Sequence, residues 1–179
     1  MSDFLLSQII AAIAFALGIV SFQFRSRRSI LFWLSGSAMA NACHFFILNR
    51  PTPGTLYLIM GGRSLAAAFT VNRKIMYLFL GLVLVGFFFS YKYALGFLGL
   101  FGTLLATYGS FQKTYRTVRV LFMLSAASWM VHNLLARTPV AALMEATFLA
   151  SNLIGYWRFH RSDKATRAPG QDLTEERTG

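Results

Sequence analysis

Apolar runs of about 16 to 20 residues alternate with short clusters of charged residues along most of this 179-residue chain. The hydrocarbon core of a bilayer is spanned by about 20 residues of helix, and backbone amides in lipid must find their hydrogen-bond partners within the same segment. Charged residues make up only 13% of the chain and hydrophobic residues 56%. Because so few charges cannot keep a surface in water, the pattern predicts an all-α membrane protein whose main partner is the lipid bilayer.

Seven spans fit the pattern, at about residues 4–22, 30–48, 55–71, 75–90, 95–111, 120–136 and 140–157. The first run has no positive n-region and precedes Arg25, Arg27 and Arg28, so we expect a retained helix rather than a cleaved signal peptide. Alternate turns and the tail together hold thirteen Lys and Arg residues, against three in the other turns. The positive-inside rule then predicts an N-terminus outside and a C-terminus in the cytoplasm.

One stretch of the chain occurs twice. Ser21-Phe22-Gln23 matches Ser110-Phe111-Gln112 at an offset of 89, and His44 matches His132 at an offset of 88, as Pro51 matches Pro139. The repetition predicts two parallel three-helix repeats joined by a linker helix, a 3+1+3 arrangement. The expected units are residues 1–74 for the first repeat, 75–94 for the linker helix, 95–158 for the second repeat and 159–179 for a disordered cytoplasmic tail.

Polar side chains recur on one face of the second and sixth spans. The two sets are Ser35, Ser37, Asn41 and His44, and Ser125, Ser128, Trp129 and His132. There are two interpretations of these polar faces. In one they line a pocket between the repeats, and in the other they make hydrogen bonds between helices; the sequence is compatible with both. Two histidines do not complete a metal coordination shell, so we expect no metal site and no cofactor.

Arg63 and Glu145 are the charged residues placed well inside spans, where a lone charge is costly. We expect them to pair across the two repeats; the alternative is that each is satisfied separately. Asn152 lies seven residues after Glu145 on the same helix face, and Trp129 lies near the expected midplane. An amide beside a mid-membrane aromatic ring suits a small polar ligand, although packing alone also accounts for both residues.

Several protein classes are disfavoured by the same residues. The net charge of +11 would suggest nucleic-acid binding in a soluble protein, but here most basic residues lie in turns and in the tail, so we expect no nucleic-acid partner. Cys43 is the single cysteine, which excludes an intrachain disulfide. No nucleophile with a base and no paired carboxylates are found in the spans or turns, so we do not expect an enzyme.

The chain resembles a known family at specific residues. SFQ with its basic turn, HFFIL, Arg63, VHNLLA and MEATFLASNLIGYWRF resemble the bacterial YgjV-type inner-membrane proteins over about residues 5–162. The resemblance implies the bacterial inner membrane and brings no established activity. The 3+1+3 layout is also similar to the SWEET/PQ-loop superfamily of small-solute transporters, but Phe22-Gln23 and Phe111-Gln112 stand where that superfamily has Pro-Gln. Asn152 falls at a binding asparagine of the sugar transporters, whereas the matching position is Ser64, so a symmetric sugar site is not expected.

The leading hypothesis is therefore a permease for a small polar or anionic solute. Its expected binding residues are Arg63, Asn152, Trp129, Glu145, Asn41, His44 and His132. The alternative is a membrane receptor or assembly partner that uses the same cavity without transport. The sequence does not determine the solute, a coupling ion or the oligomeric state.

Overall fold

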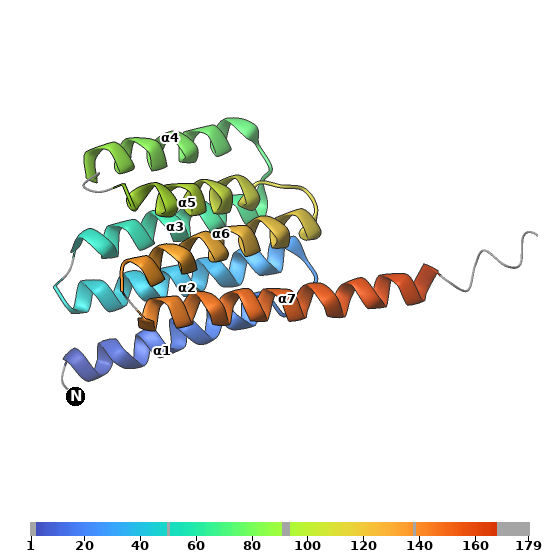
Figure 1. The fold of residues 1–179 in the computed structure, drawn as a ribbon, viewed down its shortest axis with the longest axis horizontal. Helices are drawn as coiled ribbons and strands as arrows, with labels where there is room; N and C mark the ends of the chain where they lie inside the picture. Colours follow the sequence, from blue (N-terminus) through green and yellow to red (C-terminus); the bar gives the residue numbers. More distant parts are fainter. Residues whose placement is uncertain (1–2, 50, 91–93, 138, 168–179) are drawn as a thin grey trace, which may run out of the picture.

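The structure, a computed structural model, describes residues 3–49, 51–90, 94–137 and 139–167. Within these ranges it contains seven α-helices and no strand, which confirms the all-α prediction (Figure 1). The helices are α1 (Asp3–Ser21), α2 (Arg27–Ile47), α3 (Pro51–Phe69), α4 (Arg73–Ser90), α5 (Gly96–Ser110), α6 (Tyr115–Leu135) and α7 (Pro139–Arg167).

Four bounds differ from the expected ones by three residues or more. α2 begins at Arg27 and α6 at Tyr115, three and five residues earlier than expected. α3 begins at Pro51 rather than near residue 55, because proline is well suited to the first turn of a helix. α7 continues to Arg167 and passes the expected boundary at residue 158, so that it extends beyond the other helices in Figure 1. Residues 168–179, the rest of the expected tail, lie outside the described residues.

α2 and α6 begin and end alike. Each has 21 residues, and each starts at a hydroxyl N-cap, where the side chain of Ser26 or Thr114 accepts a hydrogen bond from a backbone N–H three residues later. Each is followed by a residue with positive φ, Asn49 at 55° and Arg137 at 57°. A left-handed residue ends a helix sharply, so α3 and α7 turn back against the helices that precede them.

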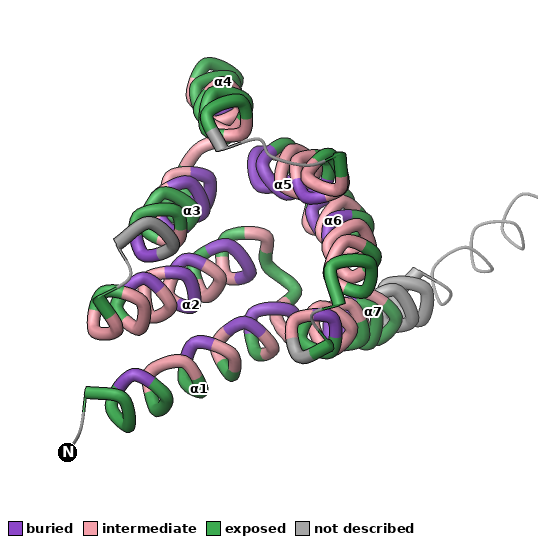
Figure 2. The backbone as a smooth tube through the Cα atoms, turned by 60° about the vertical axis from the view of Figure 1, so that its left-hand side comes forward, coloured by how far each residue is buried: buried purple, intermediate pink, exposed green. Residues whose placement is uncertain are grey.

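The helices form two layers of three. α1, α2 and α3 pack in chain order in one layer, and α5, α6 and α7 do so in the other. The layers meet at two edges, where α1 contacts α7 and α3 contacts α5, while α4 packs on α5 outside both layers (Figure 2). The purple buried segments of Figure 2 lie on the sides of the helices that face their neighbours.

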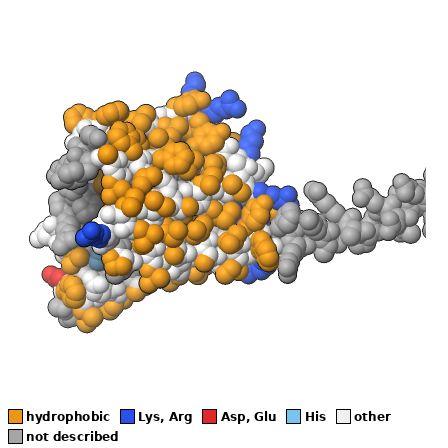
Figure 3. All heavy atoms as spheres, in the orientation of Figure 1, with side chains coloured by type: hydrophobic (Ala, Val, Ile, Leu, Met, Phe, Trp, Pro, Cys, Tyr) orange, Lys and Arg blue, Asp and Glu red, His pale blue; other side chains and the backbone are white. Residues whose placement is uncertain are grey.

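The two ends of the bundle differ in charge. We call the end that carries turns 22–26, 70–72 and 111–114 the basic end, and the other the opposite end. Lys and Arg side chains gather at the basic end in Figure 3, whereas the face between the ends is largely hydrophobic. α1, α2 and α6 are long and apolar enough to cross a membrane by length and composition alone.

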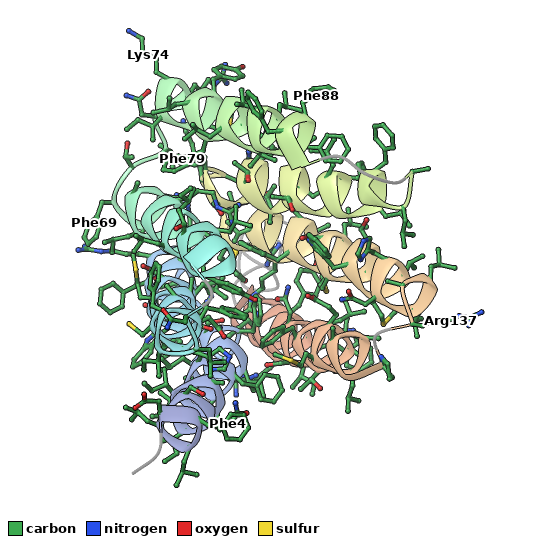
Figure 4. The ribbon with its side chains drawn as sticks, turned by 90° about the vertical axis from the view of Figure 1, so that its left-hand side faces the viewer. Phe4, Phe69, Lys74, Phe79, Phe88 and Arg137 are labelled. Atoms are coloured by element: carbon green, nitrogen blue, oxygen red, sulfur yellow. The ribbon has the colours of Figure 1, made fainter. Side chains whose placement is uncertain are left out.

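The hydrophobic core lies toward the basic end. Its buried residues are Leu31, Ala67, Ala68, Met76 and Phe111. Phe79 of α4 packs against this cluster and stacks with Phe111 at 6.2 Å between ring centroids. In Figure 4, Phe69 and Lys74 point away from the helices instead. The cluster joins α2, α3 and α4 to the end of α5, and thereby fixes where the two layers meet.

Candidate functional site: the seam between the two layers

Arg63 is a buried cation at the α3/α5 edge. It is 5% exposed, and its Nη1 donates a 2.6 Å hydrogen bond to Oγ1 of Thr107 on α5. Its Nε is buried without a hydrogen-bond partner in the described part of the chain. Thr107 is neutral, and its own hydroxyl donates to the carbonyl of Thr103. No acidic side chain that the structure describes compensates the guanidinium, so an anion would be strongly attracted to this site.

The expected pair between Arg63 and Glu145 is wrong. Arg63 lies about twelve residues from the start of α3, whereas Glu145 lies about six residues from the start of α7. At about 1.5 Å per residue, their depths differ by roughly 9 Å. The predicted spans imply a smaller difference in depth, because they begin α3 four residues later than the structure does. Arg63 reaches α5, its nearest neighbour in the other layer, and finds Thr107 there.

Glu145 interacts with a different residue of α3. The carboxylate lies near enough to the hydroxyl of Tyr57 for an electrostatic interaction, and both side chains are half-buried. Tyr57 also stacks on Phe45 of α2, with ring centroids 5.4 Å apart. This residue of α3 lies nearer the opposite end than Arg63 does.

One face of α3 becomes steadily more covered toward the basic end. Leu56, Met60, Arg63 and Ala67 follow one another at helical spacing, and their exposed fractions are 60%, 37%, 5% and 0%. The same face is thus open where α3 begins and closed near where it ends. Arg63 lies at the transition between the exposed and the buried part of this face.

Arg119 is the largest fully buried side chain in the described structure, and it lies on α6. Its Nη1 donates to Oδ1 of Asn152 at 3.0 Å, and the amide of Asn152 donates back to the backbone oxygen of Arg119 at 2.8 Å. Its Nη2 donates to the carbonyl of Phe24, which follows α1. Asn152, an expected ligand residue, is therefore held by Arg119 and fully buried.

Arg27 makes a comparable link from α2. Its Nη2 donates to the carbonyl of Ala67, and to those of Thr70 at 3.3 Å and Ser110 at 2.9 Å. Ser110 ends α5 in the other layer. Each of the two arginines thus starts on the second helix of its own layer and reaches the end of the first helix in the other.

Further hydrogen bonds close the α1/α7 edge near the basic end. Gln23 donates to Oγ of Ser151 at 2.9 Å, Ser151 donates to the carbonyl of Ile19 at 2.9 Å, and Arg158 donates to the carbonyl of Gln23. A side chain at Gly155 would collide with the Phe22 carbonyl and the Arg119 guanidinium, so α7 approaches the end of α1 as closely as a backbone can. We call these contacts, with those of Arg27, Arg63 and Arg119, the seam.

The other expected ligand residues lie within single layers. Trp129 packs against Gly99 and Gly102 of α5, and its ring meets that of His132. Asn41 donates to the carbonyl of Ser37 on its own helix at 3.2 Å. Nδ1 of His44 lies 2.8 Å from the carbonyl oxygen of Ser7 on α1, and Nδ1 of His132 lies 3.4 Å from Oδ1 of Asn133. The structure therefore does not bring the expected set together in one pocket.

The sequence contains a signal for the buried position of Arg119. This residue falls in a basic turn just before the predicted span 120–136, but at the offset of 88 it matches Leu31, a core residue. An arginine in place of a buried leucine predicts an interior role. No group of three His, Cys, Asp or Glu side chains that could hold a metal ion is found among the described residues.

Comparisons with known proteins give a family but no solved fold. A family model described as a bacterial inner membrane protein, Imp-YgjV, matches residues 5–163. The inner membrane protein YgjV of Escherichia coli strain K12 is 27% identical over 164 residues, which cover 92% of this chain and 90% of that protein. No solved structure matches the chain.

Proposed function

Because this chain belongs to the YgjV family of bacterial inner membrane proteins, we propose that it is a permease of that membrane for a small polar or anionic solute. Arg63 carries the proposal. It is a buried cation whose single hydrogen bond in the described structure goes to a neutral hydroxyl. A buried charge without a counter-charge is so costly that the chain gains by receiving an anion there.

The exposed start of α3 supports a route by which a solute reaches the guanidinium of Arg63. The face that carries Leu56 and Met60 is uncovered toward the opposite end, whereas Ala67 is fully covered on the other side of Arg63. A solute entering from the opposite end would reach Arg63 before it met the seam contacts of Arg27 and Arg119. These contacts would then form the closed inner barrier of an outward-facing state.

We propose that the two layers are repeats in the 3+1+3 arrangement, with all seven helices crossing the membrane and α4 as the linker. The matched N-caps Ser26 and Thr114, and the matched left-handed residues Asn49 and Arg137, lie at the offset of 88 that the histidines give. Local features that repeat at one offset support duplication of the whole unit. Alternating access would open the seam between the repeats while closing the opposite end.

The basic end is proposed to face the cytoplasm. α2, α4 and α6 begin there, and Arg27, Arg73, Lys74 and Arg116 lie in their first turns. Basic residues concentrate on the cytoplasmic side of bacterial inner membrane proteins. The N-terminus of α1 would then lie outside.

Solute uptake into liposomes tests the permease. We would reconstitute the purified chain and measure uptake of a panel of labelled monocarboxylates, phosphate and neutral polyols. For an anion, Arg63→Gln should lower saturable uptake at least about tenfold, since a charge-assisted hydrogen bond contributes about 1.5 to 3 kcal/mol. Arg63→Lys should retain part of it, and Arg137→Gln, which removes an exposed arginine at the opposite end, should leave it unchanged.

The outcomes separate the two hypotheses. Saturable uptake that depends on Arg63 supports a permease. Binding of a solute at Arg63 with no uptake above protein-free liposomes favours the receptor or assembly partner. Neither binding nor uptake across the panel would count against both.

A further inference from the structure

Glu145 is a half-buried carboxylate near the start of α7. Among the residues that the structure describes, its carboxylate has no hydrogen bond and no ion pair, and its electrostatic neighbour is the neutral hydroxyl of Tyr57. An ionised carboxylate inside a membrane bundle is costly unless a positive group compensates it. A cation brought to Glu145 would therefore stabilise it, and the described part of the chain supplies none.

Tyr57 and Glu145 occupy equivalent places in the two layers. They are 88 residues apart, which is the offset of the histidines and the prolines, and each lies six residues after the proline that begins its helix. α3 and α7 belong to different layers (Figure 2). In the proposed repeats, equivalent positions that interact across the layers lie beside the axis that relates them. Glu145 therefore faces the interior between the layers rather than lipid.

The side chains around this carboxylate are aromatic. The ring of Tyr57 stacks on Phe45 of α2, with centroids 5.4 Å apart. Phe148, one turn further along the same face of α7, packs on Phe15 of α1, also at 5.4 Å between centroids. The faces of aromatic rings attract organic ammonium groups, whereas a small metal ion needs several oxygen ligands. A carboxylate with aromatic neighbours therefore suits an amine.

Arg63 offers the opposite charge deeper in the bundle. It is a buried cation bonded to the neutral Thr107, and it lies roughly 9 Å farther from the opposite end than Glu145 does. Opposite charges in one protein interior attract each other, yet these two side chains do not pair. A solute that carries a cation at one end and an anion at the other would compensate both at once.

We propose that the solute is a zwitterion with well-separated charges, such as an ω-amino acid, whose carboxylate binds Arg63 and whose ammonium group binds Glu145. This solute class rests on the proposed permease and its Arg63 site. Because Glu145 lies nearer the opposite end, the ammonium group would follow the carboxylate into the bundle. Adjacent charges, as in an α-amino acid, would not reach both side chains.

Two isosteric probes test for the amine. ε-Aminocaproate carries an ammonium group where adipamate, of equal length, carries a neutral amide, and both carry a carboxylate. In proteoliposomes, ε-aminocaproate should reach half-maximal uptake at a concentration at least about tenfold lower than adipamate, since a hydrogen bond between two charged groups contributes that factor or more. Glycine, whose two charges are adjacent, should compete no better than adipamate.

Substitutions assign the advantage to Glu145. Glu145→Gln should bring the two half-saturating concentrations to within about twofold of each other, and Glu145→Asp, which keeps the charge, should retain part of the difference. Asp3→Asn is the matched control, because it removes an exposed carboxylate at the same end, and it should leave the tenfold difference in place. Arg63→Gln should weaken uptake of both probes alike.

The outcomes distinguish the solute class from the permease itself. Arg63-dependent uptake of both probes at equal half-saturating concentrations would refute the zwitterion and leave the permease in place. The shift of the unfolding midpoint measures binding without transport. No uptake of either probe, with ε-aminocaproate bound more tightly than adipamate by the unsubstituted chain but not by Glu145→Gln, would support the zwitterion site and refute transport.

Three further results would refute the zwitterion. They are a preference for ε-aminocaproate that survives in Glu145→Gln, a preference that falls equally in Asp3→Asn, and adipamate uptake that a sodium or proton gradient drives and that Glu145→Gln abolishes. In the last case the carboxylate would bind a coupling cation instead of the solute. Neither uptake nor binding of any probe would count against both the solute class and the permease.

Discussion

Arg63 and Arg119 are both buried arginines, but they differ in the number of acceptors that they reach. The Nε of each is buried without a hydrogen-bond partner in the described structure. Arg119, however, donates from its other nitrogens to Asn152 and to the Phe24 carbonyl, whereas Arg63 has a single hydrogen bond to Thr107. A buried charge that is well bonded stabilises a fold, and one that is poorly bonded costs free energy until a ligand reaches it. The two side chains should therefore respond in opposite ways to the same substitution.

Arg63→Met should leave the free energy of unfolding unchanged or raise it by about 1 kcal/mol or more, because an apolar side chain replaces an uncompensated charge. The hydroxyl of Thr107 keeps its bond to Thr103, so no donor is left unpaired. Arg119→Met is the matched control and should lower stability by about 2 to 4 kcal/mol. Thermal unfolding in one detergent measures both. Equal losses in the two variants would show that Arg63 is already satisfied.

The bond between Arg119 and Asn152 can be isolated by a double-mutant cycle. Arg119→Gln and Asn152→Ala should each destabilise the chain, and the double variant should lose about 1 to 2 kcal/mol less than the sum of the two. The coupling reports the bond from Nη1 of Arg119 to Oδ1 of Asn152, since the bond back from Asn152 ends on the backbone oxygen of residue 119, which glutamine also supplies. Additive losses would contradict the direct link.

At the scale of helices, the α1/α7 edge depends on Gly155. A methyl group there would meet the Phe22 carbonyl and the Arg119 guanidinium, so Gly155→Ala should lower stability by about 1 to 3 kcal/mol. Gly81→Ala on α4 is the control, because a methyl group there meets nothing within 4 Å. It should be neutral or slightly stabilising, since alanine favours helix. Thermal unfolding of the two variants distinguishes a close contact from a general effect of glycine.

The helices could be predicted from the sequence because each depends on its own residues. The long apolar runs, the caps Ser26 and Thr114, and the prolines that begin α3 and α7 are all local. The start of α3 was placed four residues late, since Pro51 to Gly54 read as a turn by composition but lie within the helix. That error moved Arg63 toward Glu145 and produced the pairing that the structure does not have.

The partners of polar side chains could not be predicted in the same way. They depend on which helices become neighbours. Trp129 was placed at a ligand site by its depth, yet it fills the space that Gly99 and Gly102 leave between α5 and α6. Asn152 is an expected solute ligand, but it binds Arg119, which is the fifth residue of α6 and lies just outside the predicted span 120–136. The depth of a side chain in the membrane follows from counting residues along its own helix. The direction in which the side chain points, and the residues that it meets, depend on how the helices pack together.

For the molecule as a whole, the proposed orientation can be tested by labelling. In a Cys43→Ala background, Arg137→Cys should react with a membrane-impermeant maleimide on intact spheroplasts, and Lys113→Cys should react only after the membrane is opened. Both side chains are exposed and lie at opposite ends of the bundle, and Arg137 points away from the helices in Figure 4. The reverse pattern would place the basic end outside and refute the orientation that the positive-inside rule gives.

The bonds of Arg27 and Arg119 across the seam end mostly on carbonyl oxygens of the main chain. Every amino acid supplies that oxygen, so a substitution at Phe24, Thr70 or Ser110 leaves the acceptor in place, whereas loss of either arginine removes the donor. Methods that infer contacts from correlated substitutions among related sequences would therefore detect few of these contacts, because the residue that supplies the backbone acceptor can change without loss of the hydrogen bond.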